Sequence, residues 1–322
     1  MKIAKNILEL VGNTPLVYLN KVNSPSGAKI AAKLESANPG GSVKDRIGLW
    51  MVKDAIERGV LKPGGTIIEP TSGNTGVGLA LAAIIHGFKM IAVMPDKVPV
   101  EKIQLLEAYG AECVICPTDV DPQDPRSYYE TSKRLNREIE NSFLPQQYYN
   151  EKNMDAHYHS TGPEIWRDTD GKISVFATGV GTGGTISGTS KYLKEQNPKI
   201  RTVGIDTVGS VIKGFFETGK IEVYHPYLID GIGEDFIPGN IKFEYIDEVI
   251  QIPDKVAYQI TMRLAREEGM FTGSSGGAAV AGAIEVANRL TPNELVVVIL
   301  PDTGARYLSK LNDKWLSSKG LL

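Results

Sequence analysis

Short apolar runs alternate with longer segments of helical periodicity along much of this chain. The runs that predict strands are Thr66–Glu69, Met90–Met94, Glu112–Cys116, Ile173–Ala177, Thr202–Asp206 and Leu295–Leu300. The segments that predict helices are Val77–Ile85, Val100–Tyr109, Ile186–Gln196, Gly277–Leu290 and the stretch from Ser42 to Gly59. Strands that alternate with helices favour an α/β fold, in which helices cover both faces of a mostly parallel sheet. Ligands bind such sheets at the carboxyl ends of the strands, so the loops that follow the strands are candidate sites.

The composition narrows the class of protein. Of 322 residues, 42% are hydrophobic and 23% are charged, which is typical of a globular enzyme with one large or two medium domains. The formal net charge is -3 and no basic stripe is present, so nucleic acid and anionic membranes are disfavoured as partners. The first residues turn polar too soon for a signal peptide, and no window approaches the ~18 apolar residues of a membrane span. We therefore expect a cytoplasmic protein.

The two cysteines, Cys113 and Cys116, form a CxxC pair inside a predicted strand. Residues three apart on a strand point to opposite faces, which separates the two sulfur atoms. The chain has no further cysteine to complete a zinc site, and its four histidines lie far away in sequence. A structural role is therefore favoured over a redox pair, and no metal site is expected.

The segment 38–46 predicts a turn followed by the start of a helix, with Ser42 as N-cap and Asp45 three residues later as in a capping box. Lys44 then lies in the first helical turn, where the helix dipole disfavours a cation. This position is poor for stability but suits an amine that forms a Schiff base, because a lowered pKa makes it a better nucleophile. A solvated surface lysine is the alternative interpretation.

Residues 71–76, here called the Asn74 loop, lie between a predicted strand and a predicted helix. Small hydroxyl and amide side chains are concentrated here, as Thr71, Ser72, Asn74 and Thr75. Free backbone N–H groups at a helix start, together with such side chains, bind carboxylates and phosphates. The loop is therefore a candidate anion site.

Residues 178–185, here called the Gly179 loop, also connect a strand to a helix and are rich in glycine. Gly179, Gly181 and Gly184 satisfy GxGxxG, and Asp206 ends the next strand at the spacing of a ribose-binding acid. An NAD-dependent oxidoreductase is therefore the alternative function. Two hydroxyls, on Thr182 and Thr185, favour a single phosphate monoester instead.

Residues 273–277 match GxSxG, the nucleophile motif of α/β-hydrolases. That fold requires a strand before the serine and a histidine after it. Here a helical segment precedes the motif, and the last histidine is His225. The hydrolase interpretation therefore fails.

Together, these four segments resemble the β-family of pyridoxal-5′-phosphate (PLP) enzymes, specifically the cysteine synthase and cystathionine β-synthase group. The similarity runs from about Asn6 to about Lys310. It implies a fold-type-II enzyme with PLP between two α/β domains, one of residues 37–148 and a larger one of residues 1–36 and 149–322 that carries the phosphate loop. It also implies a homodimer.

The resemblance assigns a role to each motif. Lys44 would hold PLP as a Schiff base and later act as acid and base at Cα, Asn74 would bind the ring oxygen, and Ser275 would meet the pyridine nitrogen. The implied phosphate ligands are Gly181, Thr182, Gly183, Gly184 and Thr185. The implied ligands of the substrate carboxylate are Thr71, Ser72, Thr75 and Gln147.

The implied reaction is β-elimination or β-replacement on a serine- or cysteine-type amino acid. PLP serves as an electron sink that the protein tunes at the ring nitrogen, and serine is a neutral partner for that nitrogen. Loss of the β-substituent would leave an aminoacrylate, which sulfide, a thiol or water can attack. A scaffold protein without catalysis is a third interpretation, which the presence of Lys44 argues against.

The motifs divide between the two branches of the group. Segments 146–150, 156–158, 206–210 and 230–236 are more similar to cystathionine β-synthases, whereas 301–308 is closer to cysteine synthases. Gly277 replaces an alanine usual in cysteine synthases, and Asp230 precedes the Gly-Ile-Gly loop. Asp230 could serve as a base for water or a thiol, with hydrogen sulfide released from cysteine, or could simply cap a turn or pair with a base. The motifs leave open whether a serine acetyltransferase associates with the protein.

Overall fold

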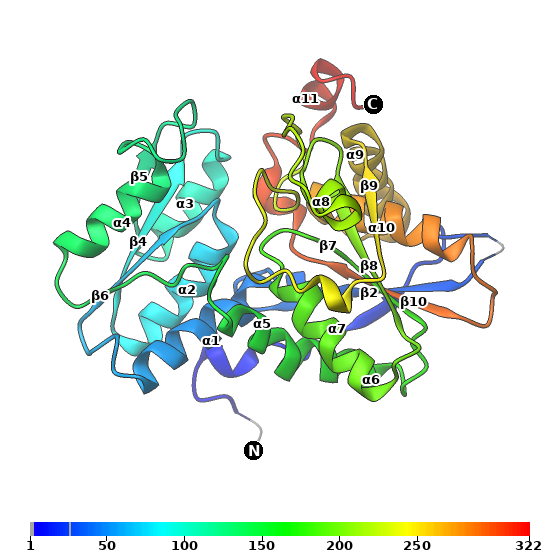
Figure 1. The fold of residues 1–322 in the computed structure, drawn as a ribbon, viewed down its shortest axis with the longest axis horizontal. Coiled ribbons are helices and arrows are strands. Elements are labelled where there is room, and N and C mark those ends of the chain that lie inside the picture. The colour runs from blue at the N-terminus through cyan, green and yellow to red at the C-terminus, as the bar shows by residue number, and fades with distance from the viewer. Residues whose placement is uncertain (1–2, 26) are drawn as a thin grey trace. The chain divides into compact units, whose positions relative to one another are not determined.

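The computed structural model describes residues 3–25 and 27–322, which form two compact units. Unit 1 consists of Met1–Val11 and Asn38–Asn153, and unit 2 consists of Gly12–Ala37 and Met154–Leu322. Each unit has its own sheet with helices packed on it (Figure 1). None of the helices in the described part of the chain is long and apolar enough to cross a membrane.

Unit 1 is built on a four-stranded sheet in the order β5-β4-β3-β6, and all neighbouring strands are parallel. Its strands are β3 (Thr66–Pro70), β4 (Lys89–Pro95), β5 (Glu112–Cys116) and β6 (Ser142–Phe143). Its helices are α1 (Lys44–Glu57), α2 (Asn74–His86), α3 (Val100–Ala108) and α4 (Tyr128–Glu138), and α5 (Lys152–Ala156) lies where the chain passes to unit 2. Helix α4 covers an apolar cluster on one face of the sheet, formed by Ile68, Ile91, Val93 and Cys116.

Unit 2 is built on a six-stranded sheet in the order β1-β2-β10-β7-β8-β9, in which only the β1–β2 pair is antiparallel. Its strands are β1 (Leu16–Tyr18), β2 (Lys29–Leu34), β7 (Val175–Gly179), β8 (Arg201–Thr207), β9 (Glu248–Ile252) and β10 (Leu295–Leu300). Its helices are α6 (Gly162–Asp168), α7 (Gly184–Gln196), α8 (Ile212–Thr218), α9 (Asp254–Arg263), α10 (Ser274–Ala287) and α11 (Asp313–Ser318).

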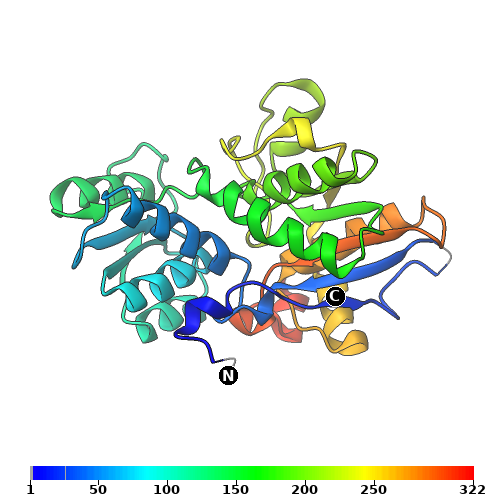
Figure 2. The ribbon, with the colours of Figure 1, turned by 90° about the horizontal axis from the view of Figure 1, so that it is seen from below.

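The central strand β10 shows how unit 2 buries both faces of its sheet. Val296 and Val298 belong to the core that contains helices α9 and α10, whereas Val297 and Ile299 belong to a second core that includes residues of α6 and α7. Successive side chains on a strand point to opposite faces, so these helix pairs lie on opposite sides of the sheet (Figure 2). A continuous apolar run such as β10 is the expected sequence of a strand buried on both faces.

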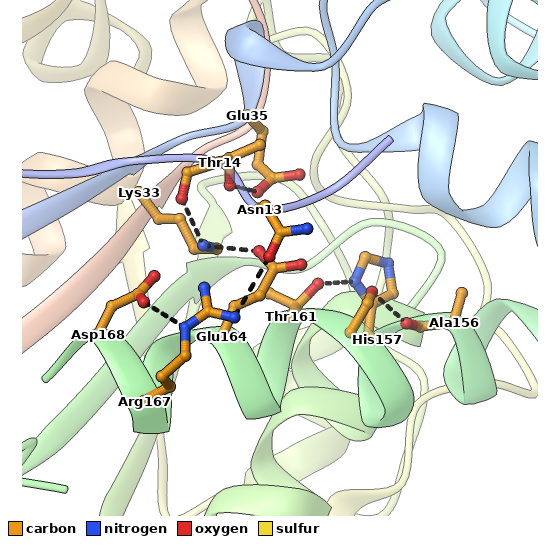
Figure 3. Close-up of polar contacts among 11 residues, drawn as sticks. Asn13, Thr14, Lys33, Glu35, Ala156, His157, Thr161, Glu164, Arg167 and Asp168 are labelled. Carbon is orange, nitrogen blue, oxygen red and sulfur yellow. Dashed lines mark hydrogen bonds and ion pairs between the residues drawn. The ribbon is translucent and has the colours of Figure 1, made fainter. Parts of the chain in front are cut away.

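These two sheets confirm the predicted α/β class with mostly parallel strands. Strand β2 was missed because Lys29 and Lys33 interrupt its apolar pattern. Lys33 is nevertheless fully buried, and its ammonium group lies 2.9 Å from a carboxylate oxygen of Glu164 and donates to the Thr14 carbonyl at 2.8 Å (Figure 3). A buried charge is tolerated only when it is paired in this way, and the partner lies far along the chain.

Candidate functional site

Lys44 lies in the first turn of helix α1, as predicted, and its side chain is half-buried, but the N-cap is Val43 and the prediction of Ser42 as N-cap is wrong. The Lys44 N–H group donates to the Ser42 hydroxyl at 3.3 Å. The capping box is wrong in detail, because the Asp45 carboxylate accepts the N–H of Gly40 in the preceding turn. Asp45 thereby ties the turn to the helix start and fixes the backbone from which the Lys44 side chain emerges.

Two glycines bring Lys44 next to the helix that follows the Asn74 loop. A Cβ atom at Gly78 of α2 would collide with the Lys44 carbonyl, and one at Gly48 of α1 would collide with the Gly78 backbone. Helices α1 and α2 therefore touch backbone to backbone at these two positions. The first turn of α1, which begins at Lys44, therefore lies against Gly78, the fifth residue of α2, within unit 1.

The Asn74 loop is shaped by the buried Thr71 hydroxyl, which accepts the N–H of Gly73 at 3.0 Å and that of Gly76 at 3.3 Å. Gly73 is the N-cap of α2 and has φ of 122°, a conformation that residues with a side chain rarely adopt. Ser72 is exposed beside it. The start of a 13-residue helix capped by glycine is a favourable place for an anion, as the sequence predicts.

Gln147 lies at this helix start although it is far from Thr75 in sequence. The Thr75 hydroxyl donates a 2.6 Å hydrogen bond to Oε1 of Gln147, and Nε2 of Gln147 donates to the Pro70 carbonyl at 3.3 Å. Thr75 and Gln147 are both buried. The structure thus brings the predicted carboxylate ligands of both segments together in unit 1.

The Gly179 loop follows β7 and ends in the first turn of α7, within unit 2. Its N-cap, Gly183, has φ of 90°, and a Cβ atom there would lie 2.5 Å from Cγ1 of Ile241. The hydroxyl oxygen of Thr185 lies 3.2 Å from Nε2 of the buried His157. His157 was not predicted as a site residue, and the other ring nitrogen lies 2.9 Å from the Thr161 hydroxyl (Figure 3).

Replacing Gly183 by alanine is expected to destabilise the protein by about 2–4 kcal/mol, because backbone strain and a collision act together. The matched control is Gly219→Ala, where φ is 70° but no atom lies within 4 Å of the new Cβ. Strain alone should then cost about 1 kcal/mol. Urea unfolding of both variants measures the difference, and equal losses would contradict a packed Gly179 loop.

Two further segments of unit 2 converge on the Gly179 loop. The Gly233 N–H donates to the Val180 carbonyl at 2.8 Å, and a Cβ atom at Gly181 would lie 2.6 Å from the Gly231 carbonyl oxygen. The Asp230 N–H in turn donates to the Ser274 hydroxyl at 3.1 Å. Residues 230–233 therefore join the Gly179 loop to the start of helix α10.

Ser275 occupies the first turn of α10 and is almost fully buried. Asp302 anchors this turn, because its Oδ1 accepts the Gly273 N–H at 3.2 Å while its Oδ2 accepts the Tyr307 hydroxyl at 2.5 Å. Glycine at position 277, where alanine was expected from the resemblance to cysteine synthases, has a structural reason. A Cβ atom there would collide with the Thr261 hydroxyl of α9. Glycine lets α9 and α10 pack closely at this point.

Asp230 forms an ion pair with Lys310, whose Nζ lies 2.9 Å and 3.1 Å from the two carboxylate oxygens. Both side chains are about one fifth exposed, at 21% for Asp230 and 23% for Lys310. The pairing was one of the two roles considered for Asp230. The ion pair orients the carboxylate, which stays partly exposed.

Asp206, on which the dinucleotide alternative depends, is fully buried at the end of β8. Its Oδ2 accepts the Lys213 N–H at 3.1 Å and Nε2 of Gln251 at 3.3 Å. Burial raises the pKa of this carboxyl group, and the hydrogen bonds only partly oppose that effect. Asp206 therefore organises the chain after β8 and is not exposed to a ribose.

Both cysteines lie on strand β5, as predicted, and both are free thiols. Cys116 packs in the apolar cluster beneath α4, whereas Cys113 is half-buried with its sulfur 4.0 Å from the Ile103 carbonyl of α3. Burial raises the pKa of the Cys113 thiol, which disfavours the reactive thiolate. No cluster of metal-ligating side chains occurs within residues 3–25 and 27–322.

The chain is similar in sequence to known proteins along nearly its whole length. The family model described as "Pyridoxal-phosphate dependent enzyme" matches residues 7–302. Cystathionine beta-synthase of Oryctolagus cuniculus is 44% identical over 324 residues, covering 100% of this chain and 59% of that protein. A probable cysteine synthase of Bacillus subtilis is 44% identical over 318 residues, covering 98% of this chain and 99% of that protein. The chain thus spans about three fifths of the rabbit relative and nearly all of the bacterial one.

Two solved structures are also similar. The O-acetylserine dependent cystathionine beta-synthase from Helicobacter pylori superimposes with a TM-score of 0.88 at 39% identity, covering 96% of this chain and 99% of that one. A hydrogen sulfide-producing enzyme from Fusobacterium nucleatum gives a TM-score of 0.86 at 35% identity, covering 95% of this chain and 100% of that one.

Proposed function

This chain belongs to the pyridoxal-phosphate dependent enzymes, and we propose that it catalyses β-elimination and β-replacement on a serine- or cysteine-type amino acid. The observation that carries the proposal is the arrangement in unit 1. The backbone of Lys44 packs against Gly78 of α2, and the first turn of this helix carries Asn74 and holds Thr75 against Gln147. An amine and a carboxylate-binding helix start are the two elements that such a reaction needs at Cα.

The Gly179 loop suits the phosphate of PLP. Its glycines pack closely against residues 231, 232 and 241, which fixes the loop backbone, and α7 adds the partial positive charge of a 13-residue helix start. The hydroxyls of Thr182 and Thr185 would accompany the N–H groups of Gly181, Gly183 and Gly184. Ser275 would meet the pyridine nitrogen as a neutral partner.

The residues of this chain would bind the substrate and transfer its protons. PLP supplies an electron sink for the bond electrons at Cα. Thr71, Ser72, Thr75 and Gln147 would hold the substrate carboxylate, so that the Cα proton faces the Lys44 amine. Lys44 would take that proton, and Asp230 would accept a proton from an incoming thiol or water.

The choice of substrates follows from Asp230 and the relatives. Sulfide is largely ionised near neutral pH and needs no base, whereas a thiol of pKa ~8.5 or water gains from one. We therefore propose that cysteine is a substrate, with hydrogen sulfide as a product, alongside O-acetylserine or serine. We also propose a cytoplasmic homodimer, as the family resemblance implies.

A steady-state assay tests this function. O-acetylserine, serine and cysteine are each supplied with and without sulfide or homocysteine, and the released sulfide and the new thioether are quantified. Sulfide release from cysteine, stimulated by homocysteine, is the expected result. Turnover of O-acetylserine with sulfide alone would instead indicate ordinary cysteine synthesis, and no turnover on any substrate would contradict the proposal.

Substitutions of Ser275 test whether this residue contacts the pyridine nitrogen of PLP. Ser275→Ala should lower the rate while PLP stays bound through the Gly179 loop. Ser275→Asp should protonate the ring nitrogen, strengthen the electron sink and slow productive elimination by about tenfold or more. Absorption spectra and single-turnover rates measure both effects. If both variants behave like the parent enzyme, Ser275 does not contact the ring.

A further inference from the structure

Glu69, the penultimate residue of β3, lies outside the predicted motifs. Its side chain is fully buried in unit 1. Each carboxylate oxygen accepts one backbone N–H: Oε2 accepts that of Gln146 at 2.9 Å, and Oε1 accepts that of Gln147 at 3.0 Å. Glu69 therefore fixes two consecutive peptide groups of a different segment.

The segment that Glu69 holds is strained. Gln146 has φ of 58°, in the left-handed region that residues other than glycine, asparagine and aspartate seldom occupy. The turn is closed by the Tyr149 and Asn150 N–H groups, which both donate to the Gln146 carbonyl at 2.9 Å. A strained conformation persists only where its surroundings impose it, and strain of this kind concentrates at functional sites.

The turn determines where the Gln147 side chain points. With its N–H on Glu69, Gln147 directs its amide toward the start of α2, where Oε1 accepts the Thr75 hydroxyl at 2.6 Å. Its carbonyl accepts Nδ2 of Asn153 at 2.7 Å. The backbone of Gln147 is thus bonded on both sides, and its side chain has one orientation within unit 1.

We propose that Glu69 is a positioning residue, which holds Gln147 in the geometry that binds the substrate carboxylate. The inference rests on the proposed function, because it deepens the role given there to Gln147. The two backbone N–H groups suit the ionised form of Glu69, in which both oxygens accept and neither donates. Burial opposes that form and raises the pKa of Glu69 to about 8, so the carboxylate gains population as the pH rises through that value.

Glu69→Gln tests the inference, because the amide places an N–H₂ group opposite one of the two backbone N–H donors. KM for the amino-acid substrate is expected to rise about tenfold or more, while kcat and PLP content change less. In the double variant with Gln147→Ala, the effect of Glu69→Gln should largely vanish, because Glu69 acts through Gln147. Glu69→Asp, which keeps the charge but is too short to reach both N–H groups, should also raise KM and serves if the amide variant fails to fold.

The matched control is Ile68→Val in the same strand, whose side chain packs beneath α4. It should lower stability by about 0.5–1.5 kcal/mol and leave KM unchanged. Hydrogen exchange gives a readout that needs no turnover: the Gln146 and Gln147 amides should lose protection in Glu69→Gln and keep it in Ile68→Val.

The outcomes separate the two proposals. If Gln147→Ala leaves KM unchanged, the assigned carboxylate site is wrong and the proposed function loses its support. If Gln147→Ala raises KM but Glu69→Gln and Glu69→Asp lower only stability, as Ile68→Val does, Glu69 is a structural residue and the inference is overturned.

Discussion

Replacing Lys44 by alanine is expected to lower turnover at least about 10³-fold and to abolish the visible absorption of the lysine-bound cofactor, while the protein remains folded. The amine would be lost both as the attachment point and as the base at Cα. The fold should survive because Lys44 is only half-buried and α1 is held to α2 through Gly48 and Gly78. Stopped-flow rates, absorption spectra and circular dichroism measure the three quantities.

The matched control is Lys53→Ala on the same helix, whose side chain is 66% exposed and pairs only loosely with Glu57 at 3.8 Å. This variant should retain parental turnover and colour. A Lys44→Ala protein that keeps its activity would remove the central assignment, whereas loss of activity in both variants would point to a general effect of changing helix α1.

Asp230→Asn is expected to slow turnover of cysteine about 10²–10⁴-fold, the usual contribution of a general base. The first half-reaction should be normal, because Asp230 is given no role in releasing the leaving group. The expected signature is a burst of one equivalent of sulfide per active site followed by a slow steady state. Rapid-quench measurement of sulfide separates the two phases.

Lys310→Met distinguishes a base from a structural ion pair. A partly exposed pair contributes only about 0–1 kcal/mol to stability, so a structural role predicts small, similar stability losses for Asp230→Asn and Lys310→Met and normal turnover in both. If Asp230 is a base, Asp230→Asn should lower turnover far more than its small stability loss explains, whereas Lys310→Met keeps the carboxylate and should retain most of the turnover. Equal steady-state rates in the parent and Asp230→Asn would return Asp230 to a structural role.

The fold was predictable where the local pattern and the burial agree. Strands β5 and β10 begin and end where the apolar runs do, at Glu112–Cys116 and Leu295–Leu300. Strand β2 was not predictable, because Lys33 gives its sequence the pattern of a surface segment. Its burial depends on the ion pair with Glu164, which is distant in sequence. Such pairing depends on contacts that only the complete fold creates.

The residues of the candidate site also differ in how far the sequence predicts them. Lys44, the Asn74 loop and the Gly179 loop were recognisable because glycine, hydroxyl and amide side chains cluster next to helix starts. Glu69 and His157 were not, because each is a single polar residue whose meaning lies in one distant partner: the Gln147 backbone for Glu69 and the Thr185 hydroxyl for His157. Sequence motifs therefore identified the residues that we propose as ligands, whereas the contacts of Glu69 and His157 became visible only in the complete fold.

The role of Lys44 can be tested by locating the covalently trapped cofactor. The purified protein, loaded with PLP, is reduced with borohydride, digested and examined by mass spectrometry. One pyridoxyl group per chain is expected, on the peptide that contains Lys44. A pyridoxyl group on any other lysine, or its complete absence from a protein that still turns over substrate, would contradict the assignment of Lys44.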